Sequence, residues 1–438
     1  MSTDRISIFW FRRDLRLNDN HGFYQALKNS KSVLPVFIFD TEILDHLKDK
    51  ADRRVDFIHR ALTAMQETIR AHGSSLYVLH GTPKEAFAKL TDEFAIDAVF
   101  TNHDYEPYAI ERDAAIKTLL EKHGIPLHTY KDQVIFEKDE VVKSDGKPYT
   151  IFTPYSKPWK QQYLNSKKVR YPSEEHLNSL EQIKNKRILS LQDIGFEKSG
   201  VDIPPTVPDK KIIQHYEETR NLPYLDGTSR MSVHLRFGTV SVRELAAMAS
   251  KLNEQFLNEL IWREFFMMIL YHFPRVVTTS FKEKYDNIEW RNNEKEFALW
   301  CEGKTGYPMV DAGMREMNAT GFMHNRVRMV VASFLTKHLL IDWRWGEAYF
   351  ADKLLDYELS SNNGNWQWAA GCGCDAAPYF RIFNPTEQQK KFDPDFKYIR
   401  KWIPDYKPGY LEPIVEHEFA RKRCLEVYKR AVADPLAP

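Results

Sequence analysis

Apolar positions in the N-terminal third of the chain follow two alternating repeats. Short runs rich in β-branched and aromatic residues, bounded by turn residues, predict strands; they read ISIFWF, SVLPVFIFD, SLYVLHG and DAVFTNHD. Between them, apolar residues at three- and four-residue steps predict helices over 53–73, 84–95 and 108–124. Strands that alternate with helices predict a parallel sheet covered on both faces, so an α/β, Rossmann-like domain is expected over residues 1–130.

The pattern changes after residue 130. Residues 131–205 are polar, rich in Lys, Pro and Ser, and weakly periodic, which predicts a connection between domains. From residue 206 strand signals nearly vanish, and long helical periods over 257–273, 324–343 and 345–359 predict an all-α domain over 206–438. No G-x-G-x-x-G motif follows any predicted strand, so the first domain is not predicted to be a standard dinucleotide binder.

Composition indicates the number of domains and the cellular location of the protein, but it says little about its function. A chain of 438 residues predicts two or three domains, and four cysteines in this length favour a reducing, cytoplasmic location. Cys372 and Cys374 lack the spacing of a zinc site, so we interpret both as packing residues and expect no metal. No apolar stretch is long enough for a bilayer, and the N-terminus does not resemble a secretory signal. The net charge of +1 neither predicts nor excludes a nucleic acid partner.

Two helical segments carry polar groups that are unusual for purely structural helices. In LNELIWREFF, Glu259, Trp262 and Arg263 share one helical face. A salt bridge beside a rim tryptophan would explain them equally well. In HNRVRMVVASF, Asn325 and Met329 share a face, although an amphipathic helix with solvated arginines is the simpler interpretation of that segment alone.

The segment SSNNGNWQWAAG combines Asn residues, glycines and two tryptophans, Trp366 and Trp368. We expect it to break the helical pattern and to line a cavity, the alternative being a loop with two packing tryptophans. Amide, acid, indole and guanidinium groups together suit a planar aromatic ligand with polar edges, such as a nucleobase or a flavin. The segment from Thr228 to Ser232 offers hydroxyls and backbone N–H groups to a phosphate, or simply caps a helix.

These segments, taken together, resemble the photolyase/cryptochrome family over essentially the whole chain. The motifs WFRRDLRLNDN, GTSRMS, NELIWREF, GKTGYPMVDAGMREMNATG, MHNRVRM, NNGNWQWAA and DAAPYFRIFNP occur in the order and at the spacing of that family. The resemblance is closest to class I-like members that repair cyclobutane pyrimidine dimers. It implies an α/β antenna domain, and a helical domain that holds FAD and binds DNA.

The resemblance also implies roles for individual residues. The FAD contacts expected from it are Tyr216, Thr228, Ser229, Arg230, Ser232, Arg263, Asn325, Arg328, Asp356, Glu358 and Asn362. Asn362 would face the flavin N5. The expected dimer pocket consists of Glu259, Trp262, Asn325, Met329 and Trp368, and the expected chain of indoles that reduces the flavin consists of Trp366, Trp343 and Trp290. Phe256, Glu358 and Asn365 depart from the common residues without removing a catalytic group.

Further contacts follow from the same resemblance. Arg220, Arg326 and Arg381 are expected to hold the phosphates of DNA, and Arg54, Asp104 and Glu106 to contact an antenna chromophore. Apolar Val276 and Val277 stand where folate-binding members carry polar groups, which favours a deazaflavin, FMN or no antenna.

The activity expected from the resemblance is that of a deoxyribodipyrimidine photolyase, a lyase that splits dimers in DNA with blue light and reduced FAD. Glu259 and Asn325 would donate hydrogen bonds to the dimer, and burial would keep Glu259 protonated for this role. The partner would be UV-damaged DNA, with no membrane, and the protein a monomer. The alternative is a cryptochrome, a blue-light photoreceptor without repair activity. Repair of the pyrimidine–pyrimidone photoproduct is disfavoured because the histidine pair of those members is missing.

Overall fold

The computed structural model describes residues 5–183 and 186–433, which divide into two compact units. The first unit takes residues 1–137, 163–207 and 230–251, and the second takes 138–162, 208–229 and 252–438. Three consecutive stretches, 1–130, 131–205 and 206–438, were expected from the sequence. The expected connection is instead shared between both units, and residues 230–251 belong to the α/β unit.

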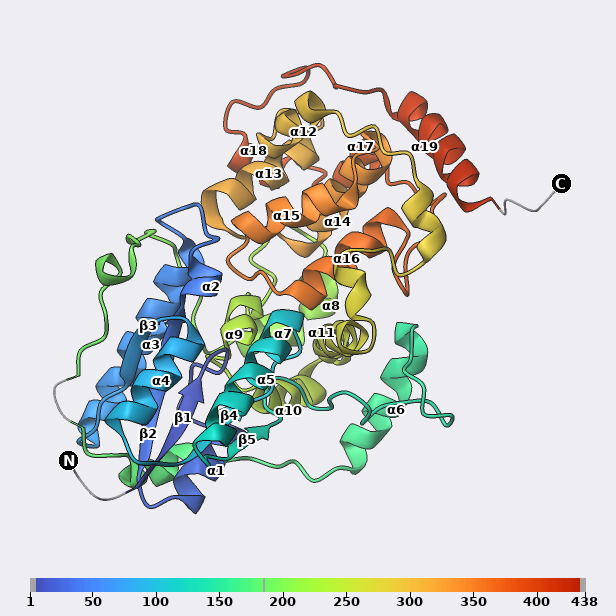
Figure 1. Ribbon diagram of the computed structural model, residues 1–438. Helices are drawn as coiled ribbons and strands as arrows, with labels where there is room; N and C mark the ends of the chain where they lie inside the picture. The colour runs from blue at the N-terminus through green and yellow to red at the C-terminus, as the bar shows by residue number, and fades with distance from the viewer. Residues whose placement is uncertain (1–4, 184–185, 434–438) are drawn as a thin grey trace. The chain divides into compact units, whose positions relative to one another are not determined.

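The first unit is built on a five-stranded parallel sheet (Figure 1). Its strands are β1 (Ile6–Phe11), β2 (Val33–Asp40), β3 (Tyr77–Gly81), β4 (Ile96–Asn102) and β5 (Leu127–Tyr130), in the order β3-β2-β1-β4-β5. Four strands match the predicted runs. The sequence pattern did not predict β5, because this edge strand has only four residues and half of them are polar.

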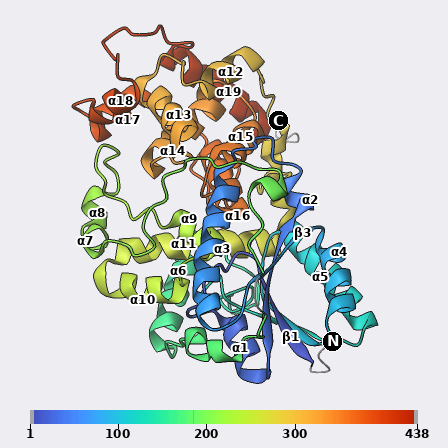
Figure 2. The same ribbon diagram turned by 90° about the vertical axis from the view of Figure 1, so that its left-hand side faces the viewer.

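Helices cover both faces of this sheet, as the alternating pattern predicted. They are α1 (His21–Asn29), the short α2 (Thr41–Leu44), α3 (Arg53–Ala71), α4 (Pro83–Glu93) and α5 (Pro107–Lys122). Figure 2 shows α1 and α3 on one side of the sheet and α4 and α5 on the other. On β1, Ile8 and Trp10 pack into the core with Phe87 of α4, whereas Phe9 and Phe11 contact Phe23 of α1.

Residues 230–251 join the α/β unit through backbone contacts that side-chain periodicity cannot reveal. The segment contains α9 (Ser232–Phe237) and most of α10 (Val242–Leu252). The N–H of Leu15 donates to the carbonyl of Phe237 at 3.0 Å, and Arg16 donates to the carbonyl of Gly238 at 3.0 Å. Gly238 has a φ of 64°, and a Cβ there would lie 2.1 Å from the Arg13 carbonyl oxygen, so only glycine fits. Short 3₁₀ helices η1 (Ser173–Ser179) and η2 (Gln192–Ile194) complete this unit.

The described part of the second unit is helical, as predicted. Its elements are α6 (Phe152–Asn165), whose last three residues fall in the first unit, α7 (Lys210–Gln214), α8 (Tyr216–Thr219), α11 (Glu254–His272), η3 (Pro274–Val277), η4 (Glu283–Asn287), α12 (Glu294–Cys301), α13 (Pro308–Thr320), α14 (Asn325–Ser333), η5 (Phe334–His338), α15 (Trp343–Lys353), α16 (Leu359–Ala370), α17 (Pro385–Phe392), α18 (Lys397–Trp402) and α19 (His417–Val432). Over the residues that the structure describes, no helix combines the length and apolarity that crossing a membrane requires.

Two helical predictions need correction. The period over 324–343 breaks into α14 and the π-helical turn η5, and it ends at Leu340, which has a φ of 51°. The segment 359–370, which was expected to break the helical pattern, is the regular helix α16. The Glu358 carboxylate caps its first turn by accepting from the N–H groups of Ser360 and Ser361. Gly371, with a φ of 90°, ends it, so the local capping signals decide where the helix begins and stops.

Candidate active site

A cavity within the second unit lies among α14, α15, α16 and the segment before α16. The residues lining it are Asn325, Arg328, Met329, Ala332, Phe350, Leu354, Asp356, Tyr357, Glu358, Ser361, Asn362, Asn365, Trp366, Trp368 and Ala369. The set brings together residues that the sequence assigned separately to a dimer pocket, to a flavin and to an electron-transfer chain. The lining residues come from two stretches of the chain, 325–332 and 350–369, which meet at this cavity.

Helical spacing explains how these side chains reach the same cavity. Asn325 and Met329 are four residues apart on α14, and Asn362, Trp366 and Ala369 repeat every three or four residues on α16. The two helices pack against each other. Apolar groups from Met329 and Trp366 thus form walls, while the amides of Asn325 and Asn362 offer polar edges.

Asp356 and Glu358, both expected at the flavin, are engaged within the protein. The Asp356 carboxylate accepts from Nη2 of Arg328 at 3.0 and 3.1 Å, and Arg328 also donates to the Met323 carbonyl at 2.7 Å. Glu358 is buried and caps α16. The pair Arg328–Asp356 fixes a guanidinium at the cavity edge, and a guanidinium is a strong hydrogen-bond donor to anionic groups.

The amide of Asn362 is held in one orientation by Glu347 of α15. Its Nδ2 donates to the Glu347 carbonyl at 3.1 Å and to the Glu347 carboxylate at 2.8 Å. Because the nitrogen is engaged, the Asn362 Oδ1 is the group left to accept a hydrogen bond in the cavity. Burial raises the pKa of Glu347, and the Asn362 hydrogen bond partly offsets this rise. Sequence reasoning missed Glu347, since nothing in its local pattern distinguishes it from a surface acid.

Glu259 and Trp262 of α11 are not among the residues that line this cavity. The Glu259 carboxylate accepts from Arg220 at 2.5 Å and from Gln255 at 3.0 Å, and its side chain is 31% exposed. The sequence analysis expected a buried Glu259, but its side chain is partly exposed and pairs with Arg220, a partner that the sequence pattern did not reveal.

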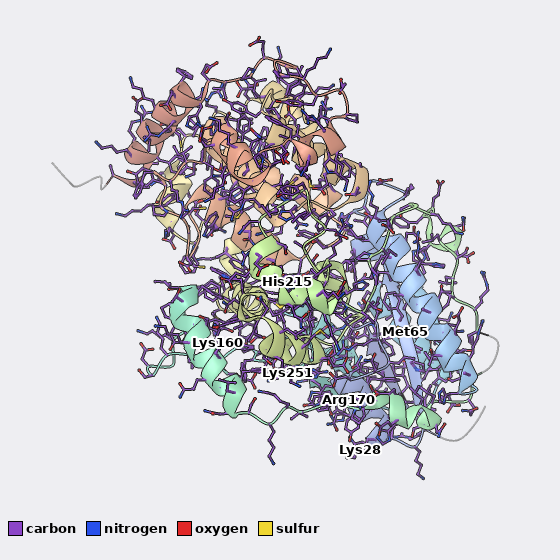
Figure 3. All side chains as sticks on the ribbon, turned by 180° about the vertical axis from the view of Figure 1, so that it is seen from behind. Lys28, Met65, Lys160, Arg170, His215 and Lys251 are labelled. Atoms are coloured by element: carbon purple, nitrogen blue, oxygen red, sulfur yellow. The ribbon has the colours of Figure 1, made fainter. Side chains whose placement is uncertain are left out.

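Trp262 is oriented by an aromatic ring that the sequence analysis overlooked. Phe152 of α6 stacks on its indole with centroids 3.8 Å apart and planes 5° apart. Lys160, labelled on α6 in Figure 3, joins the two helices through an ion pair with Glu254 at 2.5 Å. The N–H of Phe152 donates to the Asp375 carboxylate at 2.9 Å. Trp262 remains partly exposed, as does Arg263 on the same helix.

The three arginines predicted to bind DNA act on one another electrostatically. Burial lowers the pKa of Arg326, and the charges of Arg220 and Arg381 lower it further. Arg326 donates to the side-chain oxygen of Asn221 at 2.6 and 3.2 Å and lies 4.4 Å from the Phe392 ring centre. Beside Arg381, Phe380 is 63% exposed. A cluster of cations beside an exposed aromatic ring suits a polyanion with exposed bases.

The predicted chain of indoles lies within or against one apolar core. Trp366 and Trp343 are buried, whereas Trp290 is partly exposed. A Cβ at Gly346 would lie 2.2 Å from the Trp366 ring, so this glycine lets α15, which begins at Trp343, approach α16. The segment after Trp290 is tied to the start of α15, since the Asp342 N–H donates to the side chain of Asn292 at 2.9 Å. Trp300, missed by the sequence analysis, meets Trp366 edge to face at 6.2 Å.

The residues predicted to hold phosphates divide between the units. In the second unit, burial raises the pKa of Tyr216, and the nearby charge of Glu259 adds to this effect. Thr228 and Ser229 belong to the same unit, whereas Arg230 and Ser232 belong to the first. Arg230 has a φ of 51°, and α9 begins at Ser232 without any side-chain cap. The alternative interpretation of this segment as a conventional helix cap is therefore wrong.

The predicted antenna contacts of the first unit are engaged in ion pairs. Arg13 binds Asp104 at 3.1 Å and Glu106 at 2.7 Å, and Arg236 binds Glu106 at 2.8 Å. Burial opposes ionisation of Asp104, but the charges of Arg13 and of neighbouring arginines outweigh it and lower its pKa. Arg54 forms an ion pair with Asp52 at 2.5 Å.

Comparisons with known proteins agree with the sequence motifs. Residues 7–174 match the family described as DNA photolyase, and residues 256–408 match the FAD binding domain of DNA photolyase. A deoxyribodipyrimidine photo-lyase of Halobacterium salinarum is 34% identical to the chain, over 98% of this chain and 100% of that protein.

Two solved structures share the fold along almost the entire chain. The class III photolyase of Agrobacterium tumefaciens is similar with a TM-score of 0.83 at 30% identity, covering 98% of both chains. The photolyase of Sulfolobus tokodaii, solved with two FAD molecules, has a TM-score of 0.83 at 34% identity and covers 97% of this chain and 100% of its own.

Proposed function

The chain belongs to the DNA photolyase family, and we propose that it is a deoxyribodipyrimidine photolyase that splits cyclobutane pyrimidine dimers in DNA under blue light. The observation that carries this proposal is the cavity that unites Asn325, Met329 and Trp368 with Arg328, Asp356 and Asn362. One set suits a flipped pair of pyrimidines and the other suits a flavin. Their shared cavity would bring an electron donor and its acceptor into contact.

The residues at the cavity fit FAD. Met329, Phe350 and Trp366 offer apolar surface for a planar ring, and the Arg328 guanidinium and the Asn362 carbonyl oxygen offer a donor and an acceptor at its edge. When bound and reduced, FAD supplies the light-driven electron for dimer cleavage. Asn362 would accept a hydrogen bond from the ring, with Glu347 fixing its amide. Tyr216, Thr228, Ser229, Arg230 and Ser232 are proposed for the remaining polar groups, and Arg263 and Glu358 for the flavin surroundings.

The substrate is proposed to bind as two adjacent, linked pyrimidines of one strand that are flipped out of the duplex. Photolyases are among the known examples of base flipping, and a poorly stacked lesion lowers its cost. Arg220, Arg326 and Arg381 would hold the phosphates without reading sequence. Trp262 and Trp368 would present indole faces to the pyrimidines, and Met329 would fill the remaining gap.

Asn325 and Glu259 are proposed to donate hydrogen bonds to the pyrimidine carbonyls as negative charge develops there. Asn325 begins α14 at the cavity, so its amide can donate directly. Glu259 must first leave Arg220 and gain a proton. A phosphate bound to Arg220 would weaken that ion pair, which links docking of the DNA backbone to the acid form of Glu259.

Trp366, Trp343 and Trp290 are proposed to deliver electrons that reduce the flavin under light. Trp366 lines the cavity and Trp290 is partly exposed, so the order runs from cofactor to solvent. If this order is right, Trp366→Phe slows photoreduction of bound FAD. Photoreduction at the parent rate would contradict it.

The antenna, the cellular location and the oligomeric state are also proposals. An antenna, if bound, would contact Arg54, Asp104 and Glu106 and would be a deazaflavin or FMN. We propose a cytoplasmic monomer. The rival function is a cryptochrome, which would bind the same flavin without repairing DNA; the presence in the sequence of all five expected dimer-pocket residues argues against it.

The decisive experiment is repair of a UV-irradiated thymine oligonucleotide by the purified, reduced protein in the dark and under blue light. Loss of dimers only in the light is expected, and its action spectrum would reveal any antenna. If bound FAD photoreduces while dimers persist, the assignment of the dimer pocket is wrong. The cryptochrome function is then favoured. A repair assay on the pyrimidine–pyrimidone photoproduct then tests the remaining alternative.

A further inference from the structure

A cluster of tyrosines continues beyond the outer end of the proposed tryptophan chain. The Trp290 ring meets Tyr428 of α19 edge to face, with centroids 6.0 Å apart. Tyr428 in turn stacks with Tyr379 at 6.0 Å and an interplanar angle of 17°. Tyr379 lies two positions before Arg381, which we propose to bind the DNA backbone. Ring contacts therefore lead from Trp290 toward the loop that would touch the substrate.

The first feature that isolates Tyr428 is a buried cation. Nζ of Lys337, in the π-helical turn η5, lies 3.8 Å from the Tyr428 ring centre, and the lysine is 1% exposed. Its Nζ donates to the carbonyls of Ala370 at 2.9 Å and Tyr379 at 3.4 Å, which hold it in place. α19 packs against η4 and η5. An ammonium over a ring opposes the loss of an electron from that ring, most strongly where water is excluded.

The second feature is the hydroxyl of Tyr428. The residue is fully buried, and within residues 5–183 and 186–433 its oxygen has no hydrogen-bond partner. Burial raises the pKa of this phenol far above its ordinary value. Oxidation of a tyrosine removes an electron from the ring and a proton from the oxygen, and here no group accepts that proton. Trp290 differs because it is partly exposed, so its ring N–H can release a proton to water.

From these two features we propose that Lys337 ends the electron-transfer chain at Trp290 by keeping Tyr428 reduced. The proposal rests on the proposed tryptophan chain. Without the ammonium, one electron would pass from Tyr428 to the Trp290 radical cation before that cation loses its N–H proton, and the phenolic proton would pass to water entering the vacated space. The products would be neutral Trp290 and a neutral tyrosyl radical at Tyr428. Lys337 thereby keeps the oxidising equivalent away from Tyr379 and from DNA.

The charge of Lys337 can also be removed without a substitution. Burial lowers its pKa to about 8. The ionisable groups around this lysine and Tyr428 are Cys372, Cys424, Tyr285, Tyr379 and Asp342. Burial raises the pKa of Cys372 to about 12 and that of Cys424 to about 11, so both thiols stay protonated while Lys337 loses its proton.

The test is to identify the radicals formed after a laser flash on the FAD-loaded protein, by transient absorption and electron paramagnetic resonance. At neutral pH the parent and Tyr428→Phe should show the same tryptophanyl radical. Lys337→Met should show a tyrosyl radical that disappears in Lys337→Met/Tyr428→Phe. Lys337→Arg retains the charge and should behave as the parent. Lys282→Met is the matched control, because Lys282 is exposed and lies 6.0 Å from the Tyr285 ring; it should leave the radicals unchanged.

Two results would overturn the proposal: a tyrosyl radical in the parent at neutral pH that Tyr428→Phe removes, or a folded Lys337→Met without one. If Lys337→Met does not fold, the parent at a pH well above 8 replaces it. A tyrosyl radical absent from Tyr428→Phe is then expected, and its absence from both proteins contradicts the proposal.

The variant Trp290→Phe distinguishes a failure of this proposal from a failure of the proposed tryptophan chain. If the tryptophanyl signal survives unchanged in Trp290→Phe, the chain assignment is wrong and the role of Lys337 falls with it. If the signal changes but Lys337→Met yields no tyrosyl radical, only the role of Lys337 fails.

Discussion

Two arginines of the first unit and Arg326 of the second differ in the partners that surround them. At the carboxyl ends of the strands in the first unit, arginines are neutralised by acids: Arg16 binds Asp132 at 2.7 Å, and Arg243 binds the same carboxylate at 2.8 Å. In the second unit, Arg326 is held by the neutral amide of Asn221, and the charges acting on it are those of other arginines. Paired buried charges fix a structure, whereas a gathered set of like charges is suited to an anionic ligand.

The motif WFRRDLRLNDN shows why sequence alone cannot separate these purposes. Its arginines look as available for phosphate as those of MHNRVRM. Arg13 is nevertheless taken by Asp104 and Glu106, which lie about ninety positions further along the chain. Whether an arginine is free to bind a ligand depends on such distant partners.

The largest effect that we expect concerns stability of the first unit. Asp132 is fully buried, so Asp132→Ala leaves Arg16 and Arg243 without their shared carboxylate. Breaking a buried pair in this way costs about 3–5 kcal/mol of unfolding free energy, measurable by urea denaturation. Asp97→Ala is the control, because Asp97 is 63% exposed and pairs with Arg5 at 3.5 Å; its effect should stay below about 1 kcal/mol. Equal losses in both variants would contradict the structural role of the buried pairs.

The contribution of Asp132 to the stability of the fold should also depend on pH. Burial opposes ionisation of Asp132, but Arg16 and Arg243 outweigh it and lower its pKa to about 2. An unfolded aspartate has a pKa near about 3.9, so this group stabilises the fold fully above that value and loses its contribution as pH falls toward 2. Urea midpoints measured across this range should fall less steeply in Asp132→Ala than in the parent. The same slope in both proteins would rule out Asp132 as a source of the acid sensitivity.

A smaller effect, confined to binding, is expected for Arg326→Gln. The variant should fold as the parent does, bind DNA about tenfold more weakly, and reduce the slope of log affinity against log salt by about 1. Arg187→Gln removes an exposed arginine of the first unit that pairs with Asp193 at 2.7 Å, and it should leave DNA affinity unchanged. Equal weakening by both substitutions would mean that DNA does not distinguish the arginine cluster from any other positive charge.

The smallest expected effect is the difference in repair yield between two variants of Glu259, which separates its hydrogen-bonding role from its charge. Glu259→Gln can still donate and should retain most of the repair yield, whereas Glu259→Ala should lose several-fold more. Repair yield per absorbed photon under blue light is the measurement. A similar loss in both variants would remove the donor role and leave Glu259 as the partner of Arg220.

Motifs and periodicity predicted much of the fold, including four of the five strands and the helical character of the second unit. They failed where a local cap or a distant partner decides the outcome. Capping by Glu358 and Gly371 makes 359–370 a helix despite its glycine and Asn residues. Gly238 attaches residues 230–251 to the first unit through close backbone contact, which apolar periodicity cannot show.

Prediction of the candidate site also succeeded for residues on one helix and failed for partners on other elements. Helical spacing placed Asn325 with Met329, whereas the family resemblance assigned Asn362 to the flavin and Trp366 to the electron-transfer chain; all four residues line one cavity. Partners on other elements were invisible: Glu347 behind Asn362, Arg220 beside Glu259, and Phe152 against Trp262. Each of them lies at least 15 positions from the residue it contacts.

The most direct test of these two roles, backbone binding by arginines and lesion recognition by the cavity, is an affinity ratio. It compares a dimer-containing oligonucleotide with its undamaged counterpart and is measured for the parent and for Trp368→Ala. If arginines hold the backbone while the cavity selects the lesion, the parent prefers the damaged strand. Trp368→Ala then loses this preference while keeping its affinity for undamaged DNA. Equal weakening toward both strands, with the preference intact, would contradict the assignment of lesion recognition to the cavity.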